Sequence, residues 1–321
     1  MHVFITGGAG FIGSTTGERL LARGNRVTAL DAFAHGYDAA LKKRNADLLE
    51  RCGGRVVQGD IRNQALLEQL FSEDRPDVVL HMAARTGVRP SLAEPASYMD
   101  INITGTTSVL EAMRAGGVGR MVFASSSSIY GARKQGPFRE TDSTAVPASP
   151  YAATKRAGEL LCASWNHLYG MHATCLRLFT VYGPRQRPEM AIRLFAERIR
   201  QGLPIRMFGD GSSARDYTYV EDIVSGILAA IDRPLGFEII NLGNGSPVRL
   251  DQLIAGLGGA LGKEPLIEAL PDQPGDVPLT FANVEKAKKL LGYSPKTSVE
   301  KGLAAFAAWL EEDGGPTSLI D

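Results

Sequence analysis

The sequence is poor in cysteine, and its few cysteines and histidines show no pattern that would bind a metal. Its 321 residues include three cysteines, Cys52, Cys162 and Cys175, which are scattered and form no C-x-x-C pair. A disulfide framework and a structural zinc site are therefore unexpected. The five histidines have no H-x-x-x-H spacing, so we expect a site that works without a metal.

Long apolar runs and an excess of one charge are also absent. No apolar run reaches the roughly 18–20 residues that a membrane-spanning helix requires, and the apolar N-terminus lacks the basic region and cleavage site of a signal peptide. Lysines and arginines number 35, as do aspartates and glutamates. Because the net charge is zero, nothing indicates binding to nucleic acid or to an anionic membrane. We expect a cytoplasmic protein.

The first thirty-one residues carry the clearest pattern. A short apolar run, a glycine-rich turn, a helix and a second strand follow one another, and Asp31 ends that strand. Gly8, Gly10 and Gly13 have the G-x-G-x-x-G spacing that lets a pyrophosphate approach the N-terminus of a helix. Asp31 can accept hydrogen bonds from both ribose hydroxyls, and its charge would repel a 2′-phosphate, which favours NAD over NADP. A glycine turn without a ligand is the alternative.

Strand-like and helical stretches alternate along much of the chain, which predicts parallel βαβ units. Further strands are expected over 55–58, 76–80, 120–124 and 173–178. We therefore predict an α/β fold with a doubly wound parallel sheet of the Rossmann type and a smaller C-terminal α/β lobe. The NAD-binding domain would span residues 1–179, rejoined by about 220–241, and the substrate lobe would span 180–321.

Three polar residues near the predicted strands allow more than one interpretation. Asp60, after the third strand, could meet the adenine amino group or cap the next helix. His81, at the end of the fourth strand, is expected to be packed rather than catalytic. Asn102 lies inside a predicted helix over 95–115, where asparagine is unfavourable, so we expect it to bond a neighbouring loop or strand.

Tyr151 and Lys155 are four residues apart at the start of a predicted helix, so their side chains share a face. A nearby lysine and the positive charge of an oxidised nicotinamide favour the phenolate, which makes Tyr151 a general base. Ser126, after the fifth strand, could share a hydrogen bond with the substrate hydroxyl, whereas Ser125 is expected to satisfy its own backbone. For the Tyr–Lys pair, an ordinary amphipathic helix is the alternative.

Together these features resemble the extended short-chain dehydrogenase/reductases of the nucleotide-sugar epimerase and dehydratase group. The matching stretches are T-G-G-A-G-F-I-G at 6–13, S-S-S-S-I-Y-G at 125–131, Y-A-A-T-K at 151–155, V-Y-G-P-R at 181–185, R-D-Y-T-Y-V at 215–220 and Q-P-G-D at 273–276. The resemblance implies NAD as cofactor, a UDP-sugar as substrate and a homodimer. The cofactor-binding positions expected from it are Gly7, Gly10, Phe11, Ile12, Gly13, Asp31, Asp60, Ile61, Ala83, Ala84, Tyr151 and Lys155.

For the sugar nucleotide, the resemblance implies that Arg215 binds the diphosphate, Asp276 binds the ribose and Phe208 lies by the base. An arginine fork suits a diphosphate, although a local ion pair with Asp216 is the alternative for Arg215. The expected substrate-binding residues are Val88, Arg89, Ser126, Ser127, Ser128, Tyr151, Thr180, Arg185, Phe208, Arg215 and Asp276.

Two positions narrow the resemblance within this group. The 4,6-dehydratases carry Asp-Glu where Ser127 and Ser128 stand, so dehydration would lack its acid and base. Typical hexose 4-epimerases carry Asn where Thr180 stands. The stretches R-P-E-M-A at 187–191 and Q-P-G-D-V-P at 273–278 are most like the UDP-glucuronate 4-epimerases, and the small hydroxyl side chains could hold a sugar carboxylate.

The reaction expected from this resemblance is the interconversion of UDP-glucuronate and UDP-galacturonate. Tyr151, assisted by Ser126, would remove the C4 hydroxyl proton while hydride passes to NAD. The 4-keto sugar would turn over before hydride returns, and Lys155 would bond the nicotinamide ribose. The alternatives are a 4-epimerase of UDP-glucose or UDP-xylose, a UDP-glucuronate decarboxylase and a non-catalytic NAD-sensing protein. The last is disfavoured because both Tyr151 and Lys155 are present.

Overall fold

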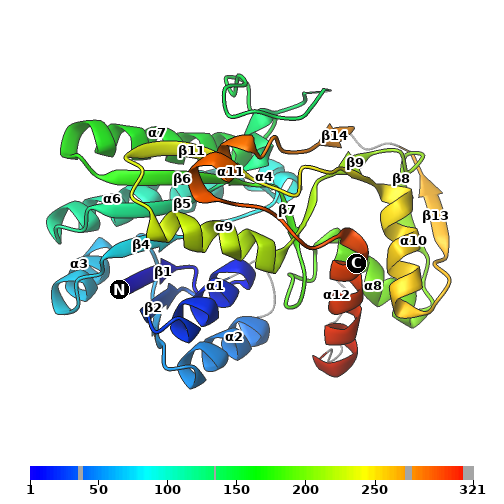
Figure 1. Cartoon of the computed structure of the whole chain (residues 1–321), viewed down its shortest axis with the longest axis horizontal. Coiled ribbons are helices and arrows are strands. Elements are labelled where there is room, and N and C mark those ends of the chain that lie inside the picture. The colour runs from blue at the N-terminus through cyan, green and yellow to red at the C-terminus, as the bar shows by residue number, and fades with distance from the viewer. Residues whose placement is uncertain (35–38, 134, 272–276, 314–321) are drawn as a thin grey trace.

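A seven-stranded parallel sheet forms the centre of the fold (Figure 1). The computed structural model describes residues 1–34, 39–133, 135–271 and 277–313. The strand order is β11-β6-β5-β4-β1-β2-β3, so it reverses between β1 and β4, where an open sheet of this kind binds its ligand. The strands are β1 (His2–Thr6), β2 (Arg26–Asp31), β3 (Arg55–Gln58), β4 (Val78–His81), β5 (Arg120–Ser126), β6 (His172–Leu178) and β11 (Phe237–Leu242).

Helices cover both faces of this sheet (Figure 1). One face carries α1 (Phe11–Ala22), α2 (Ala39–Arg51) and α9 (Val220–Asp232), and the other carries α3 (Gln64–Glu73), α6 (Gly105–Ala115) and α7 (Pro150–Tyr169). Because both faces are buried, the strands are continuous apolar runs rather than alternating ones. In β1, Val3 and Ile5 pack toward α1 and α9, and Phe4 packs toward the opposite layer.

Beyond residue 180 the chain builds a smaller lobe and returns once to the main sheet. The return consists of α9 and β11, and β11 pairs in parallel with β6. The lobe has a core of its own, to which Ile192, Leu253 and Phe306 contribute. Its elements are β7 (Thr180–Tyr182), α8 (Ala191–Gln201), β8 (Ile205–Phe208), β9 (Ala214–Arg215), β10 (Tyr217–Tyr219), β12 (Val248–Arg249), α10 (Leu250–Leu261), β13 (Ile267–Leu270), β14 (Leu279–Thr280) and α12 (Val299–Asp313). Helix α11 (Glu285–Leu291) instead packs against α9 and β11 of the main domain.

The predicted helix over 95–115 is interrupted at its centre. After α4 (Val88–Ala93), the structure has α5 (Pro95–Met99), a π-helical turn over Asp100–Thr104 and then α6. Asn102 lies in the π turn, and its side chain bonds the backbone of Arg85 and the hydroxyl of Thr154. The prediction that Asn102 bonds a neighbouring loop is confirmed, and the π turn is the kind of irregularity that often marks a functional region.

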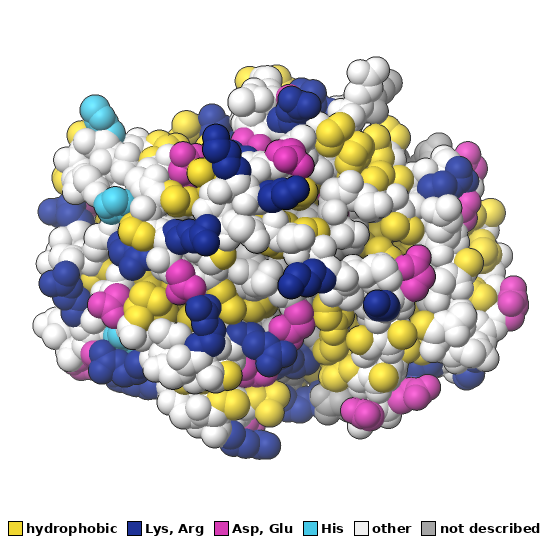
Figure 2. Space-filling view, viewed as in Figure 1, with side chains coloured by type: hydrophobic (Ala, Val, Ile, Leu, Met, Phe, Trp, Pro, Cys, Tyr) yellow, Lys and Arg dark blue, Asp and Glu magenta, His cyan; other side chains and the backbone are white. Residues whose placement is uncertain are grey.

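Basic and acidic side chains are interspersed over the face shown in Figure 2. In the part of the chain that the structure describes, every helix is too short or too polar to cross a bilayer.

Candidate active site

The turn between β1 and α1 is a cradle of backbone. Gly7 has a φ of +69°, and a Cβ atom there would lie 2.7 Å from the backbone nitrogen of Ala83. A Cβ atom at Gly13 would collide with the carbonyl oxygen of Gly7. Helix α1 begins after Gly10, which supplies no side-chain cap, and its first turn carries no acidic residue. The helix N-terminus therefore fits a pyrophosphate. The predicted contacts Phe11, Ile12 and Gly13 form this first turn.

Asp31 is fixed beside the cradle at the end of β2. Its carboxylate accepts hydrogen bonds from the backbone nitrogens of Ala9 at 3.2 Å and Phe33 at 2.9 Å. The Nζ atom of Lys42 lies 3.4 Å from the same carboxylate. An acid oriented next to the glycine turn is placed to meet ribose hydroxyls, so the residues present fit NAD.

Asp60 follows β3 and is held by its own neighbour. Its carboxylate accepts hydrogen bonds from the backbone nitrogen of Arg62 at 2.8 Å and from the guanidinium at 2.6 Å, and this guanidinium lowers the pKa of Asp60. The alternative that Asp60 caps the next helix is wrong, because the Asn63 side chain caps α3 by accepting from the nitrogen of Leu66 at 3.1 Å. Asp60 stays a predicted adenine contact, and Ile61 packs into the core beside it.

His81 ends β4 and is fully enclosed. Its ring nitrogens bond the hydroxyls of Thr6 at 2.6 Å and Thr106 at 3.0 Å. Burial lowers the pKa of His81 to about 3, so the ring is neutral. This agrees with the interpretation of a packed residue. The next small residues are the predicted cofactor contacts Ala83 and Ala84, and Ala83 lies directly against the glycine cradle.

Ser126, Tyr151 and Lys155 meet at the carboxyl edge of the sheet. Ser126 is the last residue of β5, and the other two lie in the first turns of α7. The side chain of Ser126 lies close enough to the phenol of Tyr151 to lower its pKa. The Nζ atom of Lys155 donates to the carbonyl oxygen of Ala124 at 2.7 Å. The structure thus brings together the three residues that the sequence singled out for proton transfer.

Burial controls the protonation of this group. It raises the pKa of Tyr151 and lowers the pKa of Lys155 to about 8. Ser126 and Arg187 act against burial at Tyr151 without overcoming it. The protein's own side chains therefore do not bring the pKa of Tyr151 below its usual value, and the prediction of a lowered pKa rests on the lysine together with a bound nicotinamide. We predict that the positive charge of a bound nicotinamide lowers the pKa of Tyr151.

A buried ion pair joins α7 to β6. Glu159 of α7 and Arg177 of β6, 0% and 2% exposed, form two hydrogen bonds of 2.8 and 2.9 Å. Ser125 donates to Glu159 at 2.7 Å, so the prediction that it satisfies its own backbone is wrong. Glu159 lies one turn beyond Lys155, and Ser125 precedes Ser126. The network therefore fixes α7 and β5 relative to each other.

Several predicted substrate-binding residues surround this edge. Ser127 and Ser128 open a 3-10 turn directly after β5, and the Oγ atom of Ser128 lies 3.1 Å from that of Ser126. Thr180 begins β7. Val88 is the first residue of α4. Small hydroxyls therefore line the position where dehydratases carry an acid pair.

Arg89 and Phe208 come from the two lobes and contact each other. The guanidinium of Arg89 lies 5.6 Å from the centre of the Phe208 ring, the last residue of β8. Arg215 ends β9. The carboxylate of its neighbour Asp216 accepts three backbone N–H groups from other loops, so a pair with Arg215 is not what holds it. Asp276 lies outside the described residues.

Arg185 and Arg187, in the loop between β7 and α8, point in different directions. Arg185, a predicted substrate ligand, forms an ion pair with Glu18 of α1. Arg187, which sequence reasoning did not select, donates to the hydroxyl of Thr86 and lies close enough to lower the pKa of Tyr151. The stretch P-R-Q-R-P contains both arginines, and nothing in their spacing tells which one faces the site.

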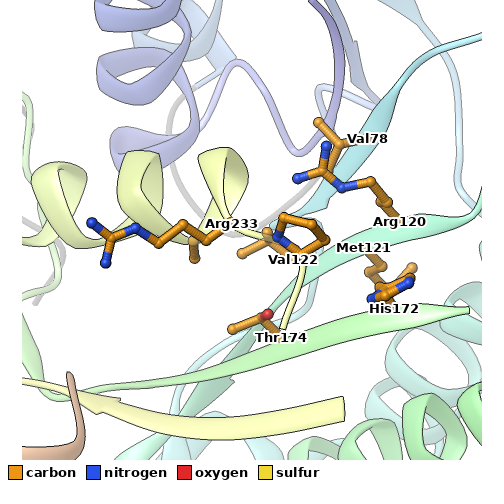
Figure 3. Close-up of a pocket in the computed structure, with 9 residues that line it drawn as sticks. Val78, Arg120, Met121, Val122, His172, Thr174 and Arg233 are labelled. Carbon is orange, nitrogen blue, oxygen red and sulfur yellow. The ribbon is translucent and has the colours of Figure 1, made fainter. Parts of the chain in front are cut away.

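A small cavity lies at the opposite edge of the sheet (Figure 3). Arg120 and His172, the first residues of β5 and β6, line it with Arg233. Its volume is about 10 Å³, enough for a water molecule at most. Among the residues that the structure describes, no group of His, Cys, Asp and Glu could hold a metal ion. We take the carboxyl edge, where Ser126, Tyr151 and Lys155 meet, as the candidate active site.

A dinucleotide cradle at the strand-order reversal, together with a Ser–Tyr–Lys group at the same edge of the sheet, is typical of enzymes of the short-chain dehydrogenase/reductase type. The comparison with protein families agrees at the level of sequence. Residues 3–243 match the model of the NAD dependent epimerase/dehydratase family, and the chain belongs to that family.

Relatives of the chain cover nearly its whole length. It is 44% identical to a UDP-glucuronate 4-epimerase of Thermodesulfobacterium geofontis, over 97% of each chain. The crystal structure of a Bacillus cereus UDP-glucuronic acid 4-epimerase with UDP-glucuronic acid and NAD has a TM-score of 0.90 at 34% identity, covering 97% of this chain and 99% of that one. A Thermotoga maritima UDP-glucose 4-epimerase has a TM-score of 0.89 at 33% identity, covering 98% and 100%.

Proposed function

We propose that the protein is an NAD-dependent 4-epimerase that interconverts UDP-glucuronate and UDP-galacturonate through a 4-keto intermediate. The observation that carries this proposal is the Ser126–Tyr151–Lys155 group beside a cradle fit for NAD, with Ser127 and Ser128 where a dehydratase needs acids. The relatives named UDP-glucuronate 4-epimerase support the choice of substrate.

In this mechanism Tyr151 moves the proton and the other two residues set its position. Its phenolic oxygen takes the proton of the C4 hydroxyl. Ser126 donates a hydrogen bond that orients this substrate hydroxyl. NAD, held by the glycine cradle and Asp31, would supply the hydride acceptor for C4 when bound. Lys155 holds the start of α7 against β5 through Ala124, which leaves the tyrosine aimed at the sugar in both half-reactions.

A 4-keto uronate is a β-keto acid and tends to lose carbon dioxide, so the site must hold the carboxylate still. We infer that Thr180, Ser127 and Ser128 bond it, and that Arg187 supplies the countercharge. Arg187 is supported for this role by its position, because it donates to the hydroxyl of Thr86 and lies close enough to Tyr151 to lower its pKa. A guanidinium matches a planar carboxylate.

The test of the proposed function is a product analysis. The purified protein is incubated separately with UDP-glucuronate, UDP-glucose and UDP-xylose, and the products are separated by anion exchange. We expect UDP-galacturonate alone. Tyr151→Phe should lower turnover by about 10²–10⁴-fold while leaving UDP binding unchanged. Conversion of UDP-glucose only would favour a neutral-sugar epimerase. The similarity to the Thermotoga maritima UDP-glucose 4-epimerase supports that alternative.

We also propose a homodimer that buries the outer face of α7. Leu160, Leu168 and Tyr169 of this helix are more than half exposed, and Met99 of α5 is partly exposed. Exposed apolar side chains of this size are typical of an interface. Light scattering should give twice the monomer mass, and Leu160→Glu should give the monomer.

A cytoplasmic location completes the proposal. Cys162 of α7 and Cys175 of β6 are buried free thiols on neighbouring elements. Free thiols are usual in a reducing compartment. Fractionation of cells that express a tagged chain would place the protein in the cytosolic fraction if this is correct.

A further inference from the structure

The loop between β7 and α8 is pinned at its centre. Gln186 is 1% exposed, and its backbone nitrogen donates to the carbonyl oxygen of Gly183 at 3.1 Å. Its side chain donates to the carbonyl oxygen of Val181 at 3.1 Å, and Arg193 of α8 donates to the carbonyl oxygen of Gln186 at 2.7 Å. These bonds make the loop rigid at Gln186. A displacement on one side of Gln186 is therefore transmitted to the other side.

On one side of Gln186, Arg185 reaches the cofactor helix. Its guanidinium forms two hydrogen bonds with the Glu18 carboxylate and a third, of 3.1 Å, with the hydroxyl of Thr15. Arg185 has a φ of +67°, a left-handed backbone that a side-chain-bearing residue adopts only where its surroundings impose it. Both Glu18 and Thr15 lie on α1, whose N-terminus forms the pyrophosphate cradle.

On the other side, Arg187 faces the reacting groups. It donates to the hydroxyl of Thr86, and the carbonyl oxygen of Thr86 accepts from the Tyr98 hydroxyl at 2.7 Å. The ring of Tyr98 stands edge-on to the ring of Tyr151, with 6.3 Å between ring centres. Arg187 also pairs with Glu189 at 2.8 Å. The loop thus spans from the NAD-binding helix to the catalytic tyrosine.

We propose that Arg185 is a positioning residue that latches this loop to α1 through Glu18 and thereby fixes the direction of Arg187. The left-handed turn at Arg185 sends its guanidinium to α1, and the pinned Gln186 carries that constraint to Arg187. The position of the cofactor helix then decides whether Arg187 is aimed at the sugar carboxylate. This last step rests on the proposed function, whereas the latch itself does not.

The test compares two alanine variants on the NAD-bound protein. Glu18→Ala removes the latch. Asp232→Ala is the control, because Asp232 of α9 pairs with Arg23 at the far end of α1 at 2.7 Å, in a bridge that is more exposed than the Arg185–Glu18 pair. Hydrogen exchange over residues 183–190 should be faster in Glu18→Ala and unchanged in Asp232→Ala. Binding of UDP-glucuronate should weaken by about three- to fivefold in Glu18→Ala, as for a partly exposed ion pair, while binding of UDP stays the same.

A third variant separates the contact from the backbone. Arg185→Asn keeps a residue that tolerates positive φ but removes the guanidinium, and we expect it to behave like Glu18→Ala. Wild-type exchange and wild-type uronate affinity in both variants would overturn the proposal. A uniform loss of UDP and UDP-glucuronate binding would overturn it as well, since that indicates general loosening. Hydrogen exchange needs no sugar, so a wild-type protein inactive on UDP-glucuronate would count against the proposed function alone.

Discussion

The ammonium group of Lys155 is bonded to the backbone carbonyl of Ala124, with 2.7 Å between nitrogen and oxygen. Ala124 lies in β5, two residues before Ser126, so this one bond ties the helix that carries Tyr151 to the strand that carries its partner. The same ammonium lies 5.2 Å from the centre of the Phe123 ring. The lysine is therefore fixed by the sheet before it meets any ligand, and its buried charge has a consequence for stability.

Stability should increase with pH because of this buried lysine. Burial lowers the pKa of Lys155 from 10.5 to about 8. Between these values the unfolded chain binds a proton that the folded chain does not, so unfolding becomes less favourable as pH rises through the window. Below pH 8 both states are protonated and the slope vanishes. The total effect is on the order of 3 kcal/mol.

Urea unfolding from pH 7 to 10 measures this effect, with Lys155→Met as the comparison because it lacks the titrating group. The wild-type midpoint should rise relative to that of the variant above pH 8. Parallel curves would show that Lys155 is not the group responsible.

The sequence predicted the sheet and the proximity of Ser126, Tyr151 and Lys155 because both follow from local patterns. The strand–glycine–helix unit and the four-residue spacing of Tyr151 and Lys155 are each contained within a few turns of chain. The central strands β1, β4 and β5 are buried on both faces, which is why their residues could be recognised without alternation. These features need no knowledge of distant contacts.

Other features depended on distant contacts and were missed or misjudged. Ser125 bonds Glu159 across two elements. The bond of Asn102 to a neighbouring loop was predicted, but the π turn in which it lies and its bond to Thr154 were not. The different directions of neighbouring arginines in the loop before α8 depend on a left-handed residue and on α1. No pattern of residue types within those stretches encodes such partners.

Breaking the buried ion pair should be costly. Glu159→Gln leaves Arg177 without its countercharge at 2% exposure, and we expect a loss of about 3–5 kcal/mol in the free energy of unfolding. Ser125→Ala removes one hydrogen bond and should cost about 1 kcal/mol. The double variant Glu159→Leu with Arg177→Met should be more stable than Glu159→Gln. Chemical denaturation measures all three, and a Glu159→Gln loss below that of Ser125→Ala would refute the role of the pair.

Thr180 should protect the intermediate from losing carbon dioxide. We expect Thr180→Ala to lower epimerisation of UDP-glucuronate and to release some UDP-pentose, since a loosened carboxylate can reach the alignment that cleavage needs. Thr180→Ser keeps the hydroxyl and serves as the control. Mass spectrometry of the products separates uronate from pentose. A Thr180→Ala variant with full activity and no pentose would remove this residue from the role.

Cofactor choice should depend on the balance between Asp31 and Lys42. The carboxylate lies where a 2′-phosphate would be placed, and the Nζ atom of Lys42 is 3.4 Å from it. Asp31→Ser removes the repelling charge and leaves the lysine to attract a phosphate, so NADP should bind more tightly and NAD more weakly. Asp31→Ser with Lys42→Met should lose the NADP gain, because the attracting charge is gone. Calorimetric titration of both nucleotides gives the ratio of affinities, and an unchanged ratio in Asp31→Ser would mean that another residue selects the cofactor.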